Sequence, residues 1–146
     1  DPEIPVLSVL DMGIVRGVLI GNDGVVVQIT PTYSGCPAMQ VIEADILTAL
    51  REAGVPSAKV ETRLFPPWTT EWMSEAGKQR LKEYGIAPPC TTENELVLLG
   101  NRTQTVPCPF CNSNATTKKS DFGSTPCKSF YFCNACTQPF EYFKPH

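Results

Sequence analysis

Two short stretches near the end of the chain decide its fold: Cys108-Pro109-Phe110-Cys111 and Cys133-Asn134-Ala135-Cys136. Two residues separate the cysteines of each pair, so one tight turn can aim both sulfurs at a single ion. The 21 residues between the stretches leave room for a hairpin, whose returning strand we expect at Phe130–Phe132. The spacing therefore predicts a zinc ribbon with four metal ligands: Cys108, Cys111, Cys133 and Cys136.

The ligand type indicates which ion and which role to expect. Four thiolates favour zinc or iron over magnesium or calcium, and a saturated four-cysteine site has no open position for substrate. We interpret the site as structural zinc; an iron–sulfur cluster and unpaired loop thiols are the alternatives. Cys127 is expected to be a small buried hydrophobe, and His146 a frayed terminus rather than a ligand.

The module from residue 106 onward has too little core to fold alone, so a bound metal should supply folding free energy. Three aromatic side chains follow the second cysteine pair, at Phe140, Tyr142 and Phe143. They either form a docking surface or cover the ribbon's own core, and we favour the second interpretation.

Upstream of this module the pattern is that of a mixed α/β domain. Two apolar, β-branched stretches, Met12–Ile20 and Gly24–Ile29, flank a strong turn signal at Gly21-Asn22-Asp23-Gly24 and predict a β-hairpin. Apolar residues then recur at helical spacing, which predicts an amphipathic helix over Pro37–Ala53. A third strand is expected at Ala58–Phe65.

A second helix is expected from a cap at Thr69 or Thr70 to about Glu83, with Gly85 ending it. A short strand is expected near Leu96–Leu99. The predicted class is α+β: a small two-layer α/β domain at 1–85, a linker at 86–105 and a zinc-ribbon module at 106–146.

Cys36 lies in Ser34-Gly35-Cys36-Pro37, at the predicted start of the first helix, where unpaired amides and the helix dipole favour a thiolate. It is either a reactive thiol or transient metal contact, or a cysteine that only packs. The sole histidine is His146, which argues against a cysteine-protease-like mechanism. A thiol redox enzyme ranks last, because no resolving cysteine forms a C-x-x-C pair with Cys36. Asp1 is a carboxylate at the start of the chain that the fold could bring toward Cys36; by default it is a solvated charge.

Composition restricts the classes of partner. The net charge is −3; residues 1–100 carry 7 basic against 13 acidic side chains, and residues 101–146 carry 5 against 2. This balance predicts no general attraction to nucleic acid or membrane, and no apolar run approaches the length of a membrane span. Seven cysteines suit a reducing cytoplasm. No signal peptide is visible, and because the chain opens without Met we expect that it was trimmed.

Two groups of motifs resemble known families. The opening Asp1–Val9, then Asp11–Val15 and Thr30–Cys36, resembles the SufT-like iron–sulfur assembly family, which has a compact α/β fold. The tail, from Cys108-Pro109-Phe110-Cys111 through Phe122–Lys128 to Pro139–Lys144, is similar to the PaaD family of accessory subunits in the bacterial phenylacetyl-CoA epoxidase system. The stretch Ser74–Pro89 fits that family too, so the likeness covers nearly the whole chain.

The resemblance implies an accessory or maturation factor for iron–sulfur or di-iron centres of the phenylacetyl-CoA epoxidase system of aerobic phenylacetate degradation. It implies no catalysis by the chain itself, subunits of the oxygenase and reductase as partners, and neither nucleic acid nor membrane; it leaves a homodimer open. Cys36 matches the family's characteristic thiol and Asp1 its leading acidic position. The implied cofactors are structural zinc and, transiently, iron or an iron–sulfur cluster. The alternative is a zinc-ribbon adaptor that binds nucleic acid or another protein.

Overall fold

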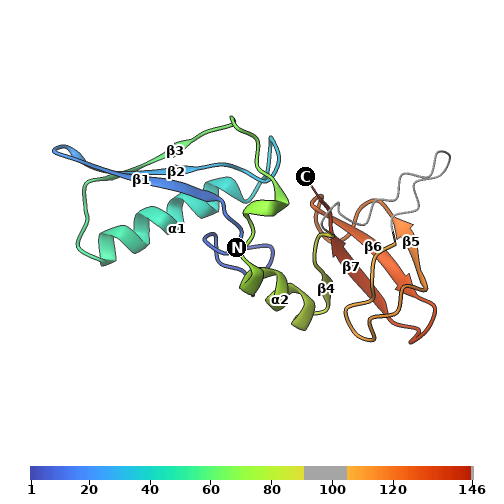
Figure 1. Cartoon of the computed structure of the whole chain (residues 1–146). Helices are drawn as coiled ribbons and strands as arrows, with labels where there is room; N and C mark the ends of the chain where they lie inside the picture. Colours follow the sequence, from blue (N-terminus) through green and yellow to red (C-terminus); the bar gives the residue numbers. More distant parts are fainter. Residues whose placement is uncertain (91–104, 146) are drawn as a thin grey trace. The chain divides into compact units, whose positions relative to one another are not determined.

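The computed structural model describes residues 1–90 and 105–145 (Figure 1). These residues form two compact units, Asp1–Gly77 and Lys78–Pro145. The expected small mixed α/β fold followed by a cysteine cluster is confirmed. The expected limits of 1–85, 86–105 and 106–146 stay a prediction. The strand expected near Leu96–Leu99 lies outside the described residues.

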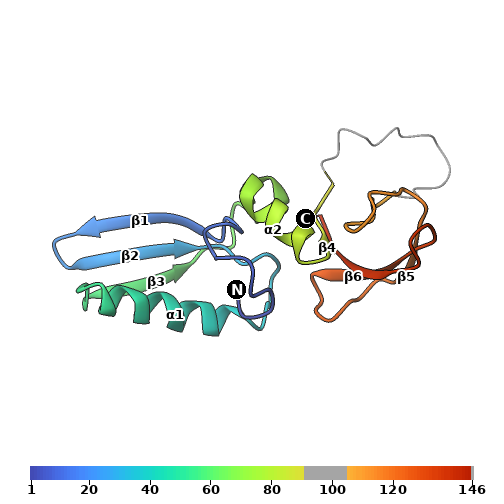
Figure 2. The ribbon, with the colours of Figure 1, turned by 90° about the horizontal axis from the view of Figure 1, so that it is seen from below.

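The first unit is a three-stranded sheet with one helix along one face (Figures 1 and 2). Strand β1 (Val15–Gly21) and β2 (Gly24–Ile29) form the predicted antiparallel hairpin, and β3 (Ala58–Thr62) pairs with β2 in parallel. Helix α1 (Met39–Glu52) connects β2 to β3, as a parallel pair requires. The two predicted layers are therefore present.

The core of this unit is aliphatic, with Ile14, Ile29 and Ile42 almost completely excluded from solvent. The loop before β1 packs closely against the segment after β3. The Trp68 indole donates a hydrogen bond to the Met12 carbonyl at 2.9 Å. Gly13 has a φ of 68°, and a Cβ there would collide with the Trp72 backbone, so only glycine fits this contact.

The second helix differs from the prediction. A short 3-10 turn, η1 (Thr70–Trp72), is followed by extended backbone at Met73, and α2 (Glu75–Glu83) begins only after it. Neither predicted threonine caps α2; the Ser74 hydroxyl accepts the Gly77 amide at 2.9 Å. The hydroxyl in turn donates to Asp11, at 2.9 Å. The prediction was wrong because the backbone is extended at Met73, and Ser74, which bonds the distant Asp11, caps the helix in place of a threonine.

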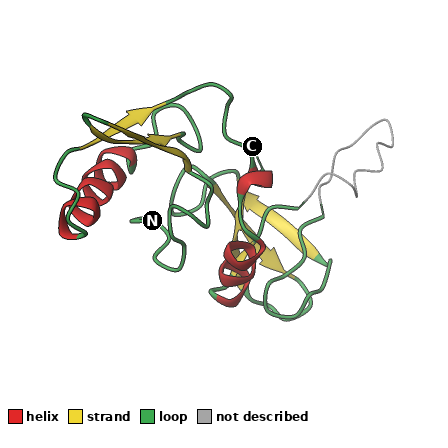
Figure 3. Cartoon of the chain, turned by 60° about the vertical axis from the view of Figure 1, so that its left-hand side comes forward, coloured by secondary structure: helices red, strands yellow, loops and turns green. Residues whose placement is uncertain are grey.

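The second unit contains a four-stranded sheet, drawn in yellow with the other strands in Figure 3. Its strands are β4 (Ile86–Ala87), β5 (Thr116–Ser120), β6 (Lys128–Cys133) and β7 (Pro139–Phe143), in the order β4-β7-β6-β5. The returning strand expected at Phe130–Phe132 is confirmed within β6. The first residues of the expected linker form β4, which pairs in parallel with β7. Among the described residues, no helix has the length and apolar character needed to cross a membrane.

Candidate metal centre

The first cysteine pair lies on a turn closed by two backbone hydrogen bonds. The Cys108 amide donates to the Ser113 carbonyl at 3.0 Å, and the Asn112 amide donates to the Cys108 carbonyl at 2.9 Å. Asn112 has a φ of 58°, a left-handed conformation that asparagine tolerates better than most residues. This reversal turns the chain directly after Cys111, so both sulfurs can face the same point.

The second pair repeats this construction. The Cys133 amide donates to the Gln138 carbonyl at 2.9 Å, five residues ahead, as Cys108 does to Ser113. Thr137 follows Cys136 as Asn112 follows Cys111, and its φ is 59°. Its hydroxyl donates to the Cys136 carbonyl at 2.7 Å. A left-handed conformation is unfavourable for a β-branched residue, so the surrounding structure must offset the backbone strain at Thr137.

The two turns bring four sulfurs together. All four Sγ atoms lie within 4.8 Å of one another. The closest approaches join the two turns: 3.7 Å between Cys108 and Cys136, and 3.6 Å between Cys111 and Cys133. Sulfurs around one tetrahedral zinc lie about 3.8 Å apart, given Zn–S bonds of about 2.3 Å, whereas a disulfide requires about 2.05 Å. The arrangement fits four thiolates around one ion.

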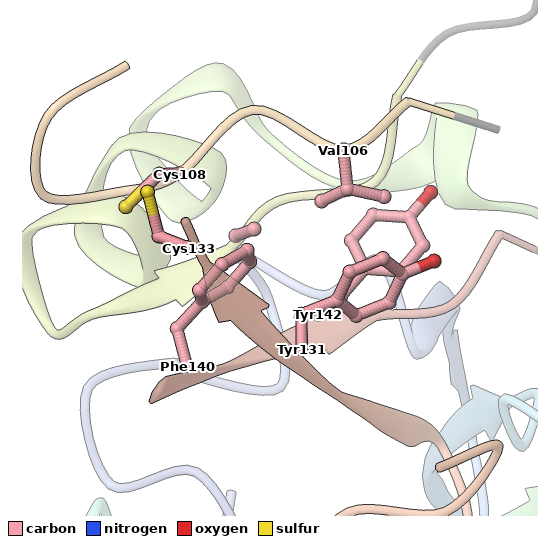
Figure 4. Close-up of a cluster of buried hydrophobic side chains, with 7 residues drawn as sticks. Val106, Cys108, Tyr131, Cys133, Phe140 and Tyr142 are labelled. Atoms are coloured by element: carbon pink, nitrogen blue, oxygen red, sulfur yellow. The ribbon is translucent and has the colours of Figure 1, made fainter. Parts of the chain in front are cut away.

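The metal centre is continuous with the core of the second unit (Figure 4). Cys108 and Cys133 are fully buried and belong to the same apolar cluster as Tyr131, Phe140 and Tyr142. The Tyr131 ring stacks on Phe140 and meets Tyr142 edge-on, each with centroids 5.7 Å apart. The aromatic side chains thus cover the ribbon's core, as favoured from the sequence.

Three of the clustered thiols, Cys111, Cys133 and Cys136, have perturbed pKa values before a cation binds. Hydrogen bonds from the Cys136 and Ala135 amides lower the pKa of Cys133 to about 7, despite its burial. Burial raises the pKa of Cys136 to about 12. A hydrogen bond from the Ser113 backbone lowers the pKa of Cys111, but partial loss of hydration at its sulfur and the thiols of Cys133 and Cys108 outweigh it, so the pKa is raised. Of these three thiols, Cys133 ionises most readily, and a bound cation would have to displace the proton of Cys136.

An ion pair between β6 and β7 stabilises the loop that connects β5 to β6. Lys128 is buried, and its Nζ lies 3.0 Å from a Glu141 carboxylate oxygen. The Ser124 amide and hydroxyl donate to the same carboxylate. Burial favours the neutral acid, but these hydrogen bonds and Lys128 outweigh it and lower the pKa of Glu141. A Cβ on Gly123 would meet the Glu141 carboxylate, which would then have to shift from its hydrogen-bonded position.

The other predicted site residues lie in the first unit. Cys36 is half-buried in a turn in which its amide donates to the Tyr33 carbonyl at 3.3 Å. Helix α1 begins at Met39, with Ala38 as its N-cap, so Cys36 precedes the helix rather than starting it. The Asp1 Oδ1 atom accepts the amides of Glu3 and Ile4, at 2.7 and 2.8 Å. Within the described residues, neither Cys36 nor Asp1 belongs to a cluster of three or more metal-ligating side chains.

Sequence reasoning overlooked two kinds of residue near the cysteine cluster. Asn112 and Thr137 were not singled out; their position directly after each C-x-x-C pair is the signal that could have found them. Cys90, half-buried, packs against the same core, and its amide lies 3.5 Å from the Tyr142 hydroxyl. Cys127 is buried, with its sulfur 3.1 Å from the Thr125 hydroxyl, in line with a small packing residue.

Comparison with known proteins supports the two-part organisation. Residues 1–62 match a family described as iron-sulfur cluster assembly protein, and residues 92–144 match the PaaD zinc beta ribbon domain. A crystal structure of a domain of unknown function, DUF59, from Bacillus anthracis has 31% sequence identity and a TM-score of 0.51, covering 56% of this chain and 78% of that chain. The solution structure of Rv1466 from Mycobacterium tuberculosis, associated with [Fe-S] complex assembly and repair, has 33% identity and a TM-score of 0.33, covering 54% and 71%.

The fold and the cysteine cluster define a small α/β assembly-type domain joined to a four-cysteine ribbon. A protein of Escherichia coli K12 that is named as a 1,2-phenylacetyl-CoA epoxidase subunit is 45% identical over 144 residues, which is 99% of this chain and 85% of the relative. The chain belongs to the same family as this relative, the PaaD family.

Proposed function

We propose that this protein is an accessory factor that assists assembly or repair of a metal centre in a phenylacetyl-CoA epoxidase system, without performing the epoxidation. The observation that carries the proposal is the presence, on one chain, of an iron–sulfur assembly domain and a PaaD-type ribbon. The relative from Escherichia coli, named as an epoxidase component, supplies the enzyme system. In this proposal the clients of the present protein are the oxygenase and reductase subunits of that system.

In this proposal the four clustered cysteines hold one structural zinc ion. The support is chemical: four sulfurs lie at tetrahedral separations, two of them are buried in the core, and the cluster found among residues 1–90 and 105–145 consists of cysteines alone. Zinc bound there orders the ribbon and presents no open position for substrate. The ribbon then serves as a rigid platform for the client.

Cys36 is proposed as the contact for the transient cargo, either iron or an iron–sulfur cluster. Its thiol is half-buried on a turn, and a Cβ built on the adjacent Gly35 would meet no atom within 4 Å, so this side of the turn is open. Asp1 is the second proposed contact. Both amide hydrogen bonds to its carboxylate use Oδ1, and Oδ2 is the oxygen that we assign to the cargo.

The main alternative was a nucleic-acid-binding ribbon, and the charges of the second unit argue against it. Lys118 and Lys119 are adjacent basic residues, but Lys118 lies 2.7 Å from the Asp121 carboxylate. Lys128 is buried beside Glu141. A basic stripe, the usual footprint of nucleic-acid binding, is missing from the described part of the ribbon.

The test is client maturation in cells that supply the Cys36→Ser variant instead of the unaltered protein. We expect the variant to fold and keep its zinc, while the client's metal content and epoxidase activity fall at least about tenfold, as for loss of one essential ligand. Cys90→Ser is the matched control, because Cys90 is also a half-buried thiol. Normal client metal content with Cys36→Ser would show that this thiol does not carry cargo.

A further inference from the structure

Strand β1 is an open, apolar edge of the first sheet. The order β1-β2-β3 leaves β1 with no described neighbour on its outer side. Val18, Leu19 and Ile20 are 53, 54 and 84% exposed. Between Gly17 and Gly21 the strand carries no charge and no proline, the devices that normally protect an edge from pairing.

The helix leaves these side chains uncovered. Val18 lies opposite Val27, and Ile20 lies opposite Val25, so each pair points to the same face of the sheet. Val27 is only 4% exposed, whereas Val18 on that face is 53% exposed. The apolar side chains of β2 are therefore buried, whereas those of the neighbouring edge strand β1 remain exposed to solvent.

The free backbone groups of this edge can be assigned. The Val25 amide donates to Ser57 and the Ile29 carbonyl accepts from Arg63, so the odd-numbered residues of β2 turn their backbone groups toward β3. Their cross-strand neighbours in β1 are therefore not hydrogen-bonded to β2. It follows that Val18 and Ile20 direct their N–H and C=O groups outward, ready for another strand.

This edge is complementary to itself. When two copies of β1 run antiparallel about a two-fold axis at Leu19, Val18 of each faces Ile20 of the other, and the outward groups of both meet. The same register places Gly17 opposite Gly21, where no side chains can clash. It also brings Arg16 at one end of β1, whose guanidinium lies over the Trp72 ring of its own chain, toward Asp23 in the other copy's turn, so charges of opposite sign face each other at both ends.

We propose that two copies of this chain associate through β1, joining their three-stranded sheets into one six-stranded sheet whose central pair is antiparallel. The pairing covers the apolar side chains that α1 leaves exposed and satisfies the outward backbone groups. The contact is small, so the dimer is weak and reversible and forms at high protein concentration. This inference does not depend on the proposed maturation role.

Sedimentation of the zinc-loaded full chain over a wide concentration range tests the association. We expect the mass to rise from 16.0 kDa toward twice that value as the concentration increases. Ile20→Lys should weaken association at least about tenfold without unfolding the protein, since this side chain is largely exposed. Leu10→Lys, at an exposed apolar residue outside β1, is the matched control and should dimerise normally.

A cross-link tests the register. Because Leu19 meets its own copy as a non-hydrogen-bonded pair, with Cα atoms about 4.5 Å apart, Leu19→Cys should form an intermolecular disulfide on mild oxidation. Leu10→Cys should not. A protein that stays monomeric at the highest concentration, or that dimerises equally well with Ile20→Lys, overturns the proposal. A monomer whose client binding is lost in Ile20→Lys also overturns it, and assigns the edge to the client.

Discussion

The two units of this chain bury apolar side chains in different ways. The first unit has an ordinary core, in which aliphatic side chains such as Ile29 and Ile42 are buried between a sheet and a helix. The core of the second unit includes Cys108 and Cys133, which are also candidate metal ligands. The comparison predicts that metal binding and core formation are coupled in the second unit, whereas the core of the first unit forms without a metal.

The largest effect is expected from Cys133→Ser. This substitution removes a fully buried ligand, and structural zinc contributes about 10–16 kcal/mol to small zinc modules, so the second unit should unfold while the first stays folded. Amide hydrogen exchange would show lost protection in β5–β7 and retained protection in β2. Equal loss of protection in both units would break the comparison.

The next largest effect is expected from pH. Each ligand must lose its proton before it binds, and the pKa of Cys136 is raised to about 12 before a cation is present. Protons therefore compete increasingly as the pH falls, and zinc affinity should decrease by at least about 100-fold between pH 8 and pH 6. Competition with a chromogenic chelator measures it. A constant affinity across this range would contradict four thiolate ligands.

A smaller effect, confined to the first unit, is expected from Ile29→Ala. Ile29 is completely buried in β2, so the substitution should lower the free energy of unfolding of this unit by about 2–5 kcal/mol without releasing zinc. Urea unfolding and zinc content would be measured together. The control is Leu10→Ala, at a side chain 69% exposed, where the change should stay within about 0.5 kcal/mol.

The smallest effect is expected from Thr137→Asn, which places in the second turn the residue type that the first turn has at Asn112. Because asparagine tolerates a φ near 59° better than a β-branched residue does, the zinc-loaded ribbon should gain about 0.5–1 kcal/mol. A higher melting temperature would be the readout. A loss of stability would mean that the threonine hydroxyl, bonded to the Cys136 carbonyl, matters more than the backbone strain.

Local signals in the sequence were enough for elements whose partners are near in the chain. The turn at Asn22-Asp23 predicted the β1–β2 hairpin, and the spacing of apolar residues predicted α1 to within two residues at its start. The spacing of the two C-x-x-C pairs likewise predicted the cluster of four sulfurs, because two residues between the cysteines allow one turn to direct both sulfurs to the same point.

Features that depend on distant contacts could not be predicted in this way. The start of α2 is determined by Ser74, whose hydroxyl accepts the Gly77 amide and donates to Asp11, 63 residues away. Strand β4 has only two residues and exists because β7 lies beside it. The left-handed conformation of Thr137 is contrary to its local preference, so residue type alone would have predicted the opposite.

The most direct test of the central claim is the metal content and sulfur coordination of the full chain purified without oxygen. Elemental analysis with X-ray absorption spectroscopy should find one zinc per chain, surrounded by four sulfurs at about 2.3 Å, in a colourless protein. Iron with sulfide and visible absorbance would contradict the assignment to zinc. A metal-free protein with a folded second unit would contradict the claim that the metal and the core form together.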